Sequence, residues 1–480
     1  MEHITKLMIT PGRGRADEKI YGQFIEHLGS CINGGVYDPK SRFADENGIR
    51  SDVRTLAKRL APPVLRFPGG TVMCLYHWED AVGPMEGRMR RKNLIWGGEI
   101  DPSFGTAEFV RYCREIGAEP MICVNMASGT PEEAGNWVEY CNGMGDSYYA
   151  ALRRSHGYEK PFNVKYWCIG NECYAEPDIG TQNDVAVYIR DAREFIKFMK
   201  LTDKSIKTVL VGSDDPAWNK AVLDALSPMA DYLSLHHYSA ENGRGVYGPF
   251  EGERQLVFML EEASALLEQY PEKVTDFNQW YRFPPREDAL QIAVDEWNIW
   301  NADNSATYGL DAHYNWRDAV WVAGALNILL SNPHVGMANM AQMVNMIAPI
   351  IAEEKGSWLQ TIAYPFLLYR EKMTGERLCT VHEPVMIDGG AADPLDALHF
   401  SALRGEDGAV RIAAVNRDFS APHTIAVETS APQCEMTTLT APAWDSVCSI
   451  DSCCVETRME KADPERITLA PGSVNLIEIR

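Results

Sequence analysis

Eight short apolar runs alternate with amphipathic stretches from about residue 20 to about residue 370, and this alternation restricts the possible folds more than any other feature. In the stretches 106–116, 185–201 and 316–330 the apolar residues recur at helical spacing. Eight strands separated by helices predict an α/β fold, the (β/α)8 TIM barrel with inserted loops. The predicted strands are Tyr21–Leu28, Val64–Phe67, Glu119–Asn125, Val164–Ile169, Thr208–Val211, Tyr232–Leu235, Leu290–Asp295 and Met337–Val344.

A doubly wound parallel sheet is the structural alternative for the same alternation. Such a sheet usually carries a glycine-rich phosphate-binding turn after its first strand. The segment Gly29-Ser30-Cys31-Ile32 does not have that composition. The barrel is therefore the preferred interpretation.

The pattern changes near Lys372, where short alternating segments punctuated by Gly, Pro, Asp and Asn replace the helical stretches. This pattern is typical of an all-β module, and we predict a C-terminal β-sandwich. A chain of 480 residues is also too long for one ordinary core. We predict an N-terminal strand at 1–16 that joins the sandwich as an edge strand, the barrel at 17–371 and the sandwich domain at 372–480.

The chain is acidic, with 45 Lys and Arg against 67 Asp and Glu and a net charge of −22. This charge argues against nucleic acid or an anionic membrane surface as a partner, because both require a basic surface. The N-terminus lacks the basic and apolar regions of a secretory signal. Because disulfides form mainly in secreted proteins, we interpret the twelve scattered cysteines as free thiols in a reducing cytoplasm. Cys448, Cys453 and Cys454 lack the paired spacing of a zinc site, so we predict no metal and no cofactor.

Two carboxylates, Glu172 and Glu296, each follow a predicted strand and lie 124 positions apart. In a parallel barrel all strand C-termini open on one face, so the fold can bring both together. A double-displacement glycosidase needs such a pair, one group to protonate the leaving oxygen and the other to attack the anomeric carbon. Asn171 could donate its amide to a sugar hydroxyl. Neighbouring strand residues point to opposite faces, so only one of Asp295 and Glu296 should face the pocket, and spacing alone favours Glu296 only slightly.

Other strand ends carry polar side chains that could contact a sugar. Arg66 could orient a carboxylate through its guanidinium, and His236 and Tyr238 would lie near the attacking group. The adjacent pair His236-His237 could suggest a metal, but neighbouring side chains on a strand diverge, so we expect one to bond and the other to pack. Several tryptophans, Trp96 among them, could stack on a sugar, although each alone is more often part of a core.

With these motifs assembled, the sequence resembles the α-L-arabinofuranosidases of glycoside hydrolase family 51 over nearly its whole length. The anchors include Tyr21–Gly29, Gly34–Pro39, Leu65–Gly70, Trp78–Asp80, Gly170-Asn171-Glu172, Asp295–Asn298, Ala338–Asn345 and Trp358–Phe366.

The resemblance implies a retaining exo-glycosidase, often a hexamer, that releases terminal arabinofuranose from hemicellulose- or pectin-derived oligosaccharides or glycosides. It implies that Glu172 is the acid/base and Glu296 the nucleophile, which favours Glu296 over Asp295 by analogy. The other implied contacts are Glu26, Asn171, Tyr238 and Gln360 to the glycone, Arg66 to the nucleophile, and Trp96 along the pocket.

The chain departs from the family pattern at three places. Thr71 replaces an asparagine that usually contacts the glycone, Pro102 replaces another asparagine, and 173–177 differ from the usual segment after the acid. The reaction type is therefore expected, while the preferred sugar or leaving group could be shifted. The alternatives are a β-xylosidase, another furanosidase or an endoglucanase of the same family, a non-catalytic sugar-binding barrel, and a metal-dependent isomerase or aldolase.

Overall fold

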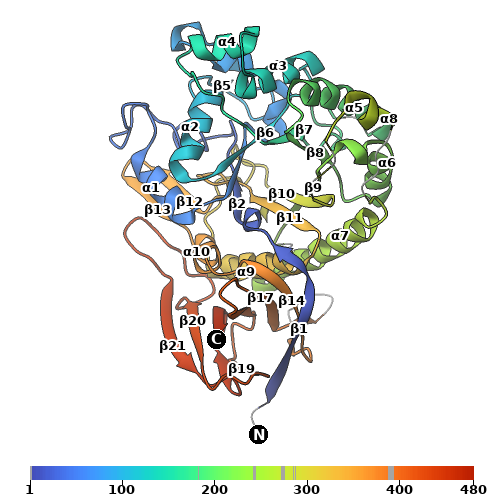
Figure 1. The fold of residues 1–480 in the computed structure, drawn as a ribbon. Coiled ribbons are helices and arrows are strands. Elements are labelled where there is room, and N and C mark those ends of the chain that lie inside the picture. The colour runs from blue at the N-terminus through green and yellow to red at the C-terminus, as the bar shows by residue number, and fades with distance from the viewer. Residues whose placement is uncertain are drawn as a thin grey trace.

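The computed structural model describes residues 3–181, 183–241, 245–271, 276–284, 286, 288–387 and 394–480. A β/α barrel and a β-rich domain lie against each other, and both chain ends belong to the β-rich domain (Figure 1). Among the described residues, no helix combines the length and apolar character needed to span a bilayer.

Eight parallel strands close the barrel in the order β10-β11-β2-β3-β6-β7-β8-β9, which confirms the predicted fold class. Their interior is filled by apolar side chains such as Met121, Val209 and Met337, so the barrel is a packed core. The strands are β2 (Gly22–Phe24), β3 (Val64–Phe67), β6 (Glu119–Cys123), β7 (Tyr166–Ile169), β8 (Lys207–Val211), β9 (Tyr232–Ser239), β10 (Gln291–Ile299) and β11 (Val335–Met340).

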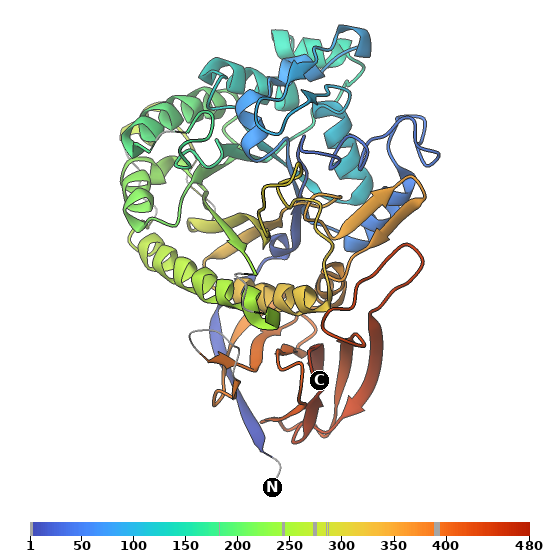
Figure 2. The same cartoon turned by 180° about the vertical axis from the view of Figure 1, so that it is seen from behind.

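Helices surround the barrel, and loops with short helices fill the connections (Figure 2). Most present one apolar face inward, whereas α9 has buried residues all round because both domains cover it. The helices are α1 (Ser51–Leu60), α2 (Thr106–Ile116), α3 (Pro131–Asn142), α4 (Tyr148–Ser155), α5 (Val185–Thr202), α6 (Pro216–Leu226), α7 (Glu251–Leu267), α8 (Asp276–Tyr281), α9 (Trp316–Ser331) and α10 (Ala363–Tyr369).

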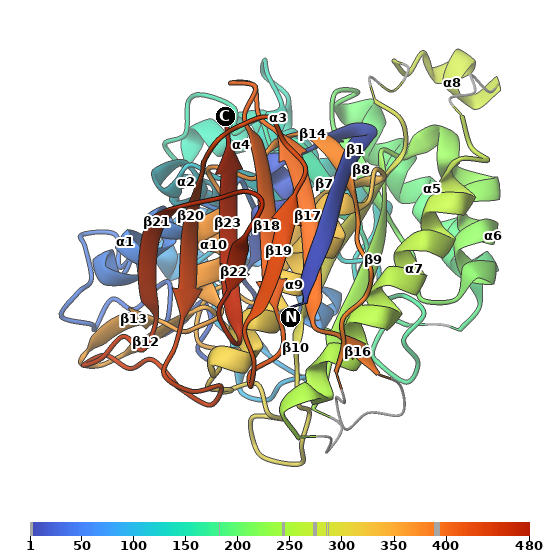
Figure 3. The ribbon, with the colours of Figure 1, turned by 90° about the horizontal axis from the view of Figure 1, so that it is seen from below.

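The second domain is built on nine connected strands in the order β21-β20-β23-β18-β17-β14-β1-β19-β22 (Figure 3). They enclose a separate apolar core that includes Leu7, Phe400, Ile425 and Ile477. The strands are β1 (Ile4–Ala16), β14 (Gly375–Val381), β17 (Leu398–Arg404), β18 (Val410–Asn416), β19 (His423–Val427), β20 (Cys434–Thr440), β21 (Glu456–Ala462), β22 (Ile467–Leu469) and β23 (Ser473–Ile479).

The N-terminal strand β1 connects the two layers of this domain. Its first residues, from Ile4 to Leu7, pair in parallel with β19, and the part from Met8 onward pairs antiparallel with β14. The strand therefore lies inside the strand order and not at an edge. Its position depends on partners more than 300 residues away, which no local pattern encodes.

Candidate active site

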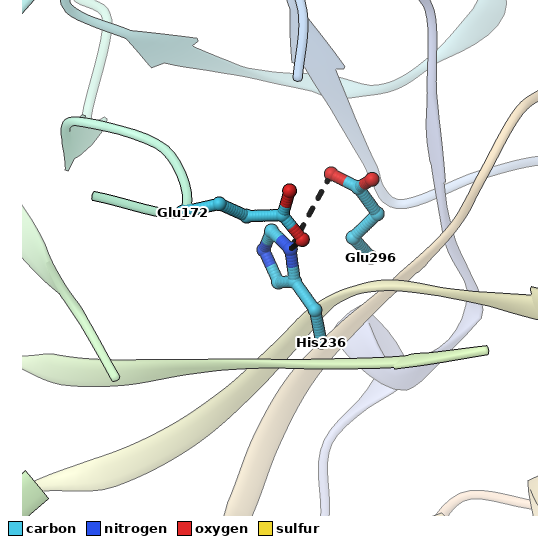
Figure 4. A group of neighbouring side chains, drawn as sticks. All are labelled: Glu172, His236 and Glu296. Carbon is cyan, nitrogen blue, oxygen red and sulfur yellow. Dashed lines mark hydrogen bonds and ion pairs between the residues drawn. The ribbon is translucent and has the colours of Figure 1, made fainter. Parts of the chain in front are cut away.

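Glu172 lies just after strand β7 in a backbone conformation that is rare for a side-chain-bearing residue. Gly170 has φ 89° and Glu172 has φ 42°, both in the left-handed region. A non-glycine residue held there carries local strain, and such positions cluster at functional sites. The turn brings the carboxylate toward Glu296 and His236 (Figure 4). One atom from each of the three side chains lies within 4.8 Å of the other two.

Two donors hold the carboxylate of Glu296, one on each oxygen. Arg66 donates from Nη1 to Oε2 at 2.8 Å, and the hydroxyl of Tyr238 donates to Oε1 at 2.7 Å. The Arg66 guanidinium is buried and stacks over the ring of Phe24 at 4.6 Å. The carboxylate is thus fixed in orientation at the end of strand β10, with its charge balanced by a neighbouring cation.

Asp295 lies deeper in the barrel and contacts the same guanidinium. Its Oδ2 is 3.3 Å from Arg66 Nε. The alternation expected along the strand does not hold here, because the pairing of β10 with β9 shifts register between Ala293 and Glu296. Such an irregularity re-aims consecutive side chains. Burial would raise the pKa of Asp295, but Arg66, together with His236 and Ser234, lowers it to about 2.

His236 bridges the carboxylates. Its Nδ1 lies 2.8 Å from Glu172 Oε1 and 3.6 Å from Glu296 Oε2, and its Nε2 lies 3.5 Å from Asp295 Oδ1. Desolvation alone would lower the pKa of His236, but the surrounding carboxylates, with Glu296 foremost, raise it to about 10. The ring is therefore an imidazolium at neutral pH. In that form it donates from both nitrogens.

Glu26, after strand β2, forms a second acidic position at the mouth. Its Oε1 accepts from the amide of Val72 at 3.1 Å and from Trp96 Nε1 at 3.4 Å, and its Oε2 accepts from Gln342 Nε2 at 2.7 Å. Burial, with a further contribution from the charge of Glu296, raises the pKa of Glu26 to about 7.

The turn Pro68-Gly69-Gly70 brings the backbone close to Glu26. A Cβ on Gly70 would lie 2.9 Å from Glu26 Oε2, and a Cβ on Gly69 would lie 3.0 Å from Glu26 Cγ. Only glycine leaves the room that this carboxylate occupies. Thr71 follows at the start of the short 3-10 helix Thr71–Leu75 and is partly buried.

Asn171 combines a fixed acceptor with an unused donor. Its Oδ1 accepts from Arg66 Nη2 at 2.6 Å, and this bond fixes the orientation of the amide. Its buried Nδ2 has no hydrogen-bond partner among the described residues. A buried donor left open beside two carboxylates is suited to a ligand oxygen.

Gln360 lies deeper than a direct sugar contact requires. Its Oε1 accepts from the amide of Tyr314 at 2.8 Å, and its Nε2 donates to the carbonyls of Ala348 at 2.8 Å and Ala312 at 3.1 Å. These bonds tie together loops at the mouth. Gln342, in contrast, contacts Glu26 directly, and sequence reasoning does not single it out. Its position two residues after strand β11 is the signal that could have identified it.

A β/α barrel whose mouth carries two carboxylates with oxygens within 4.8 Å is the arrangement of a double-displacement glycoside hydrolase. An inverting enzyme places its carboxyl groups about 6.5–9.5 Å apart to admit a water.

Comparisons with known proteins agree with this class. The family described as "Alpha-L-arabinofuranosidase 1 domain" matches residues 56–254, and "Alpha-L-arabinofuranosidase C-terminal domain" matches residues 295–463. Alpha-L-arabinofuranosidase C of Emericella nidulans is 36% identical over 437 residues, which are 85% of this chain and 84% of that protein. The "Intracellular exo-alpha-(1->5)-L-arabinofuranosidase 1" of Bacillus subtilis is 35% identical over 74% of this chain and 72% of its own.

Solved structures give the same result. An α-L-arabinofuranosidase from Thermotoga maritima, in an arabinose complex, superimposes with a TM-score of 0.87 and is 34% identical over 99% of both chains. The chain belongs to the α-L-arabinofuranosidases of glycoside hydrolase family 51.

Proposed function

We propose that this protein is a retaining exo-glycosidase that releases terminal α-L-arabinofuranosyl residues from hemicellulose- or pectin-derived oligosaccharides or glycosides. The observation that carries the proposal is the pair Glu172 and Glu296, with oxygens within 4.8 Å and different hydrogen-bond partners. Membership of the family supports the furanosyl glycone.

In the first step, Glu296 is the nucleophile and Glu172 the acid. An oxygen of Glu296 attacks the anomeric carbon, and the bond from that carbon to the leaving oxygen breaks. Glu172 gives its proton to the leaving oxygen. His236 Nδ1 donates to Glu172 Oε1, which leaves Oε2 as the oxygen that carries the transferred proton.

In the second step, Glu172 acts as the base. It takes a proton from a water that attacks the anomeric carbon of the glycosyl ester, and the ester bond to Glu296 breaks. Two inversions give net retention of configuration. The released carboxylate of Glu296 returns to its donors Arg66 and Tyr238.

The glycone is held by buried polar groups. Asn171 Nδ2 is an open donor for a sugar hydroxyl, and such a bond can strengthen in the transition state. Glu26 is a buried acceptor for a second hydroxyl, and Trp96 beside it supplies an apolar face. The name of the Bacillus subtilis relative, which includes "exo", supports exo action. Thr71 and Tyr238 complete the proposed set of glycone contacts, and Gln360 supports the loops behind them through its bonds to backbone groups.

We further propose that the protein acts in the cytoplasm on imported oligosaccharides and assembles as a homo-oligomer, with a hexamer as the expected size. The name of the Bacillus subtilis relative, which includes "Intracellular", supports the compartment. Light scattering coupled to size-exclusion chromatography tests the assembly, and a monomer at micromolar concentration would contradict it.

The function is tested with a panel of p-nitrophenyl furanosides and pyranosides and with arabino- and xylo-oligosaccharides. We expect turnover of the α-L-arabinofuranoside, single arabinose units released from chain ends, and a first product with the α configuration by NMR. Preferred cleavage of a β-xyloside, or internal fragments from a long chain, would replace this function by one of the family alternatives. A first product with the β configuration would refute double displacement.

A further inference from the structure

Three of the twelve cysteines, Cys448, Cys453 and Cys454, lie in one loop of the β-rich domain, between strands β20 and β21. The Sγ atoms of Cys448 and Cys454 are 3.1 Å apart, and the amide of Cys454 donates to Cys448 Sγ at 3.4 Å. Cys448 is buried, Cys454 is partly exposed and Cys453 is exposed. The loop therefore holds two thiols in direct contact, with a third beside them.

A tight turn brings the two thiols together. Ser449 and Ser452 exchange two backbone hydrogen bonds, at 2.8 and 3.3 Å, and these bonds reverse the chain direction. Cys448 comes just before the turn and Cys454 just after it, so their side chains lie next to each other. A disulfide bond is about 2.05 Å long, so the two sulfur atoms need to approach each other by about 1 Å.

The loop is held against the barrel domain beside both members of the pair. Val447, just before the first thiol, forms an antiparallel bridge with Asn315 at the start of helix α9. Cys453, just before the second thiol, has its Sγ 2.9 Å from the hydroxyl of Tyr364 on helix α10. These contacts fix the backbone on either side of the turn, and the proximity of the two thiols is thus a property of the folded chain.

Access distinguishes this pair from the thiols of the barrel. Cys123 and Cys168 are also neighbours, since strands β6 and β7 pair them in register, but both are buried in the barrel interior. A thiol reacts with an external oxidant only where the oxidant can reach the sulfur. Cys454 is partly exposed, so the pair in the loop meets this condition.

The surroundings of the pair also determine how fast it can react. Burial raises the pKa of Cys454, and burial together with the neighbouring Cys454 thiol raises the pKa of Cys448 to about 12. The thiolate is the form that attacks a disulfide, so only a small fraction of either thiol is reactive at neutral pH. The pair therefore stays reduced in a reducing compartment and reacts when an oxidant accumulates.

We propose that Cys448 and Cys454 form a redox modification site that closes a disulfide bond on reaction with a small-molecule disulfide. The thiolate of Cys454 attacks one sulfur of the oxidant, which releases one thiolate and leaves a mixed disulfide on Cys454. Cys448 then loses its proton to solvent and attacks the Cys454 sulfur, which releases the second thiolate. The protein is oxidised by two electrons, and the oxidant leaves as two thiols. This site lies outside the catalytic pair and does not depend on the function proposed above.

The test exposes the folded full-length protein to glutathione disulfide and stops the reaction with acid. Alkylation in denaturant should then label ten of the twelve cysteines, and the protein should carry no glutathione. Proteolysis before Asp451 separates the two cysteines, so the disulfide appears in mass spectra as two linked peptides. The reaction should run faster at about pH 9 than at about pH 7, because more of Cys454 is then thiolate.

Single variants identify the sulfur atoms involved. Cys453→Ser removes the adjacent and more exposed thiol, so it is the matched control and should form the same link at the wild-type rate. Cys448→Ser should stop at the mixed disulfide and keep one glutathione on Cys454, and Cys454→Ser should form no link. A lasting glutathione adduct on the wild type, loss of the link in Cys453→Ser, or twelve free thiols after treatment at about pH 9 would overturn the site.

Discussion

Glu172 and Glu296 lie in one charge cluster but have different partners. Both oxygens of Glu296 accept a hydrogen bond, from Arg66 and from Tyr238. Within the described part of the chain, Glu172 has one bonded oxygen, which faces His236. Two fixed donors orient a carboxylate for attack, and a free oxygen is available for proton transfer. The same residue type can thus serve two roles because its surroundings differ.

The first prediction separates these roles by leaving group. Glu172→Gln should lower kcat/KM about 10²–10⁴-fold for arabino-oligosaccharides, whose leaving oxygen needs a proton. The loss should be much smaller for 2,4-dinitrophenyl α-L-arabinofuranoside, whose leaving group departs without one. Glu296→Gln removes the nucleophile and should affect both substrates alike. Steady-state kinetics on the pair of substrates gives the result, and equal sensitivity of the two variants to the leaving group would contradict the assignment.

The second prediction concerns His236, whose pKa of about 10 keeps it positively charged across the working range. Its Nδ1 lies 2.8 Å from Glu172 Oε1 and 3.6 Å from Glu296 Oε2. Replacing it by an uncharged group, as in His236→Asn, should move both limbs of the pH–activity profile to higher pH by about one unit.

The adjacent residue His237 provides the control. Desolvation lowers the pKa of His237 to about 4, so its ring is neutral at working pH. His237→Asn should therefore leave the positions of both limbs unchanged, whatever it does to the rate. A profile for His236→Asn that falls in height without moving would show that the histidine acts through packing alone.

At the scale of elements, the site is assembled by short irregular segments at strand ends. The turn after strand β3 brings Gly70 against Glu26, and the register shift in strand β10 lets Asp295 and Glu296 both reach Arg66. The regular strands set the approximate position of each group, and the irregular residues set its direction.

The third prediction tests the turn. Gly70→Ala would place a Cβ 2.9 Å from Glu26 Oε2, so the carboxylate must move and its contact to the glycone should weaken. We expect KM to rise about tenfold, with a small change in the thermal midpoint, because the displaced group is a side chain and not the core. Gly87→Ala adds a methyl group with nothing within 4 Å and is the matched control. Unchanged KM in Gly70→Ala would show that Glu26 does not depend on this turn.

The elements also show how far local sequence predicts the fold. Strand β3 and helix α2 have the predicted bounds, because each has a strong apolar pattern and α2 ends at Gly117 in the left-handed conformation. Strand β2 is shorter than predicted, since Gly22–Phe24 alone forms the strand. Ile25 still bonds to Arg66 in β3, and His27 bonds to Pro68 in the turn after it.

The sequence predicts those residues of the candidate site that lie at the ends of strands. The proximity of Glu172 and Glu296 follows from the barrel rule and is confirmed by the distance. The bond from Gln342 to Glu26 joins residues 316 positions apart, and the bridging position of His236 depends on the register of three strands. Neither has a local signature.

At the scale of the whole molecule, helix α9 joins the two domains. Trp316 Nε1 donates to the carbonyl of Gly472 at 2.6 Å, and Asn327 Nδ2 donates to the carbonyl of Ala413 at 3.2 Å. Strand β1 also belongs to the sandwich, while the chain that follows it builds the barrel. Besides the separate core of the sandwich, a larger apolar cluster contains residues of both domains, among them Trp316 and Leu476. The two domains therefore share both polypeptide and this cluster, and we expect them to unfold together.

The fourth prediction tests this coupling at the buried pair Arg417 and Glu253, which joins the sandwich to helix α7 at 2.5 Å. Both side chains are at most 5% exposed. Arg417→Ala leaves a buried carboxyl group without its cation and should cost about 3–5 kcal/mol of unfolding free energy. Arg458→Ala breaks a pair whose arginine is 76% exposed, and it should cost at most about 1 kcal/mol.

Denaturant unfolding followed by tryptophan fluorescence and by circular dichroism should give one coincident transition in the wild type and in both variants. Two separate transitions in Arg417→Ala would show that the domains are held together by this contact more than by α9. Equal losses of unfolding free energy in the two variants would show that the buried pair contributes no more to stability than the exposed one.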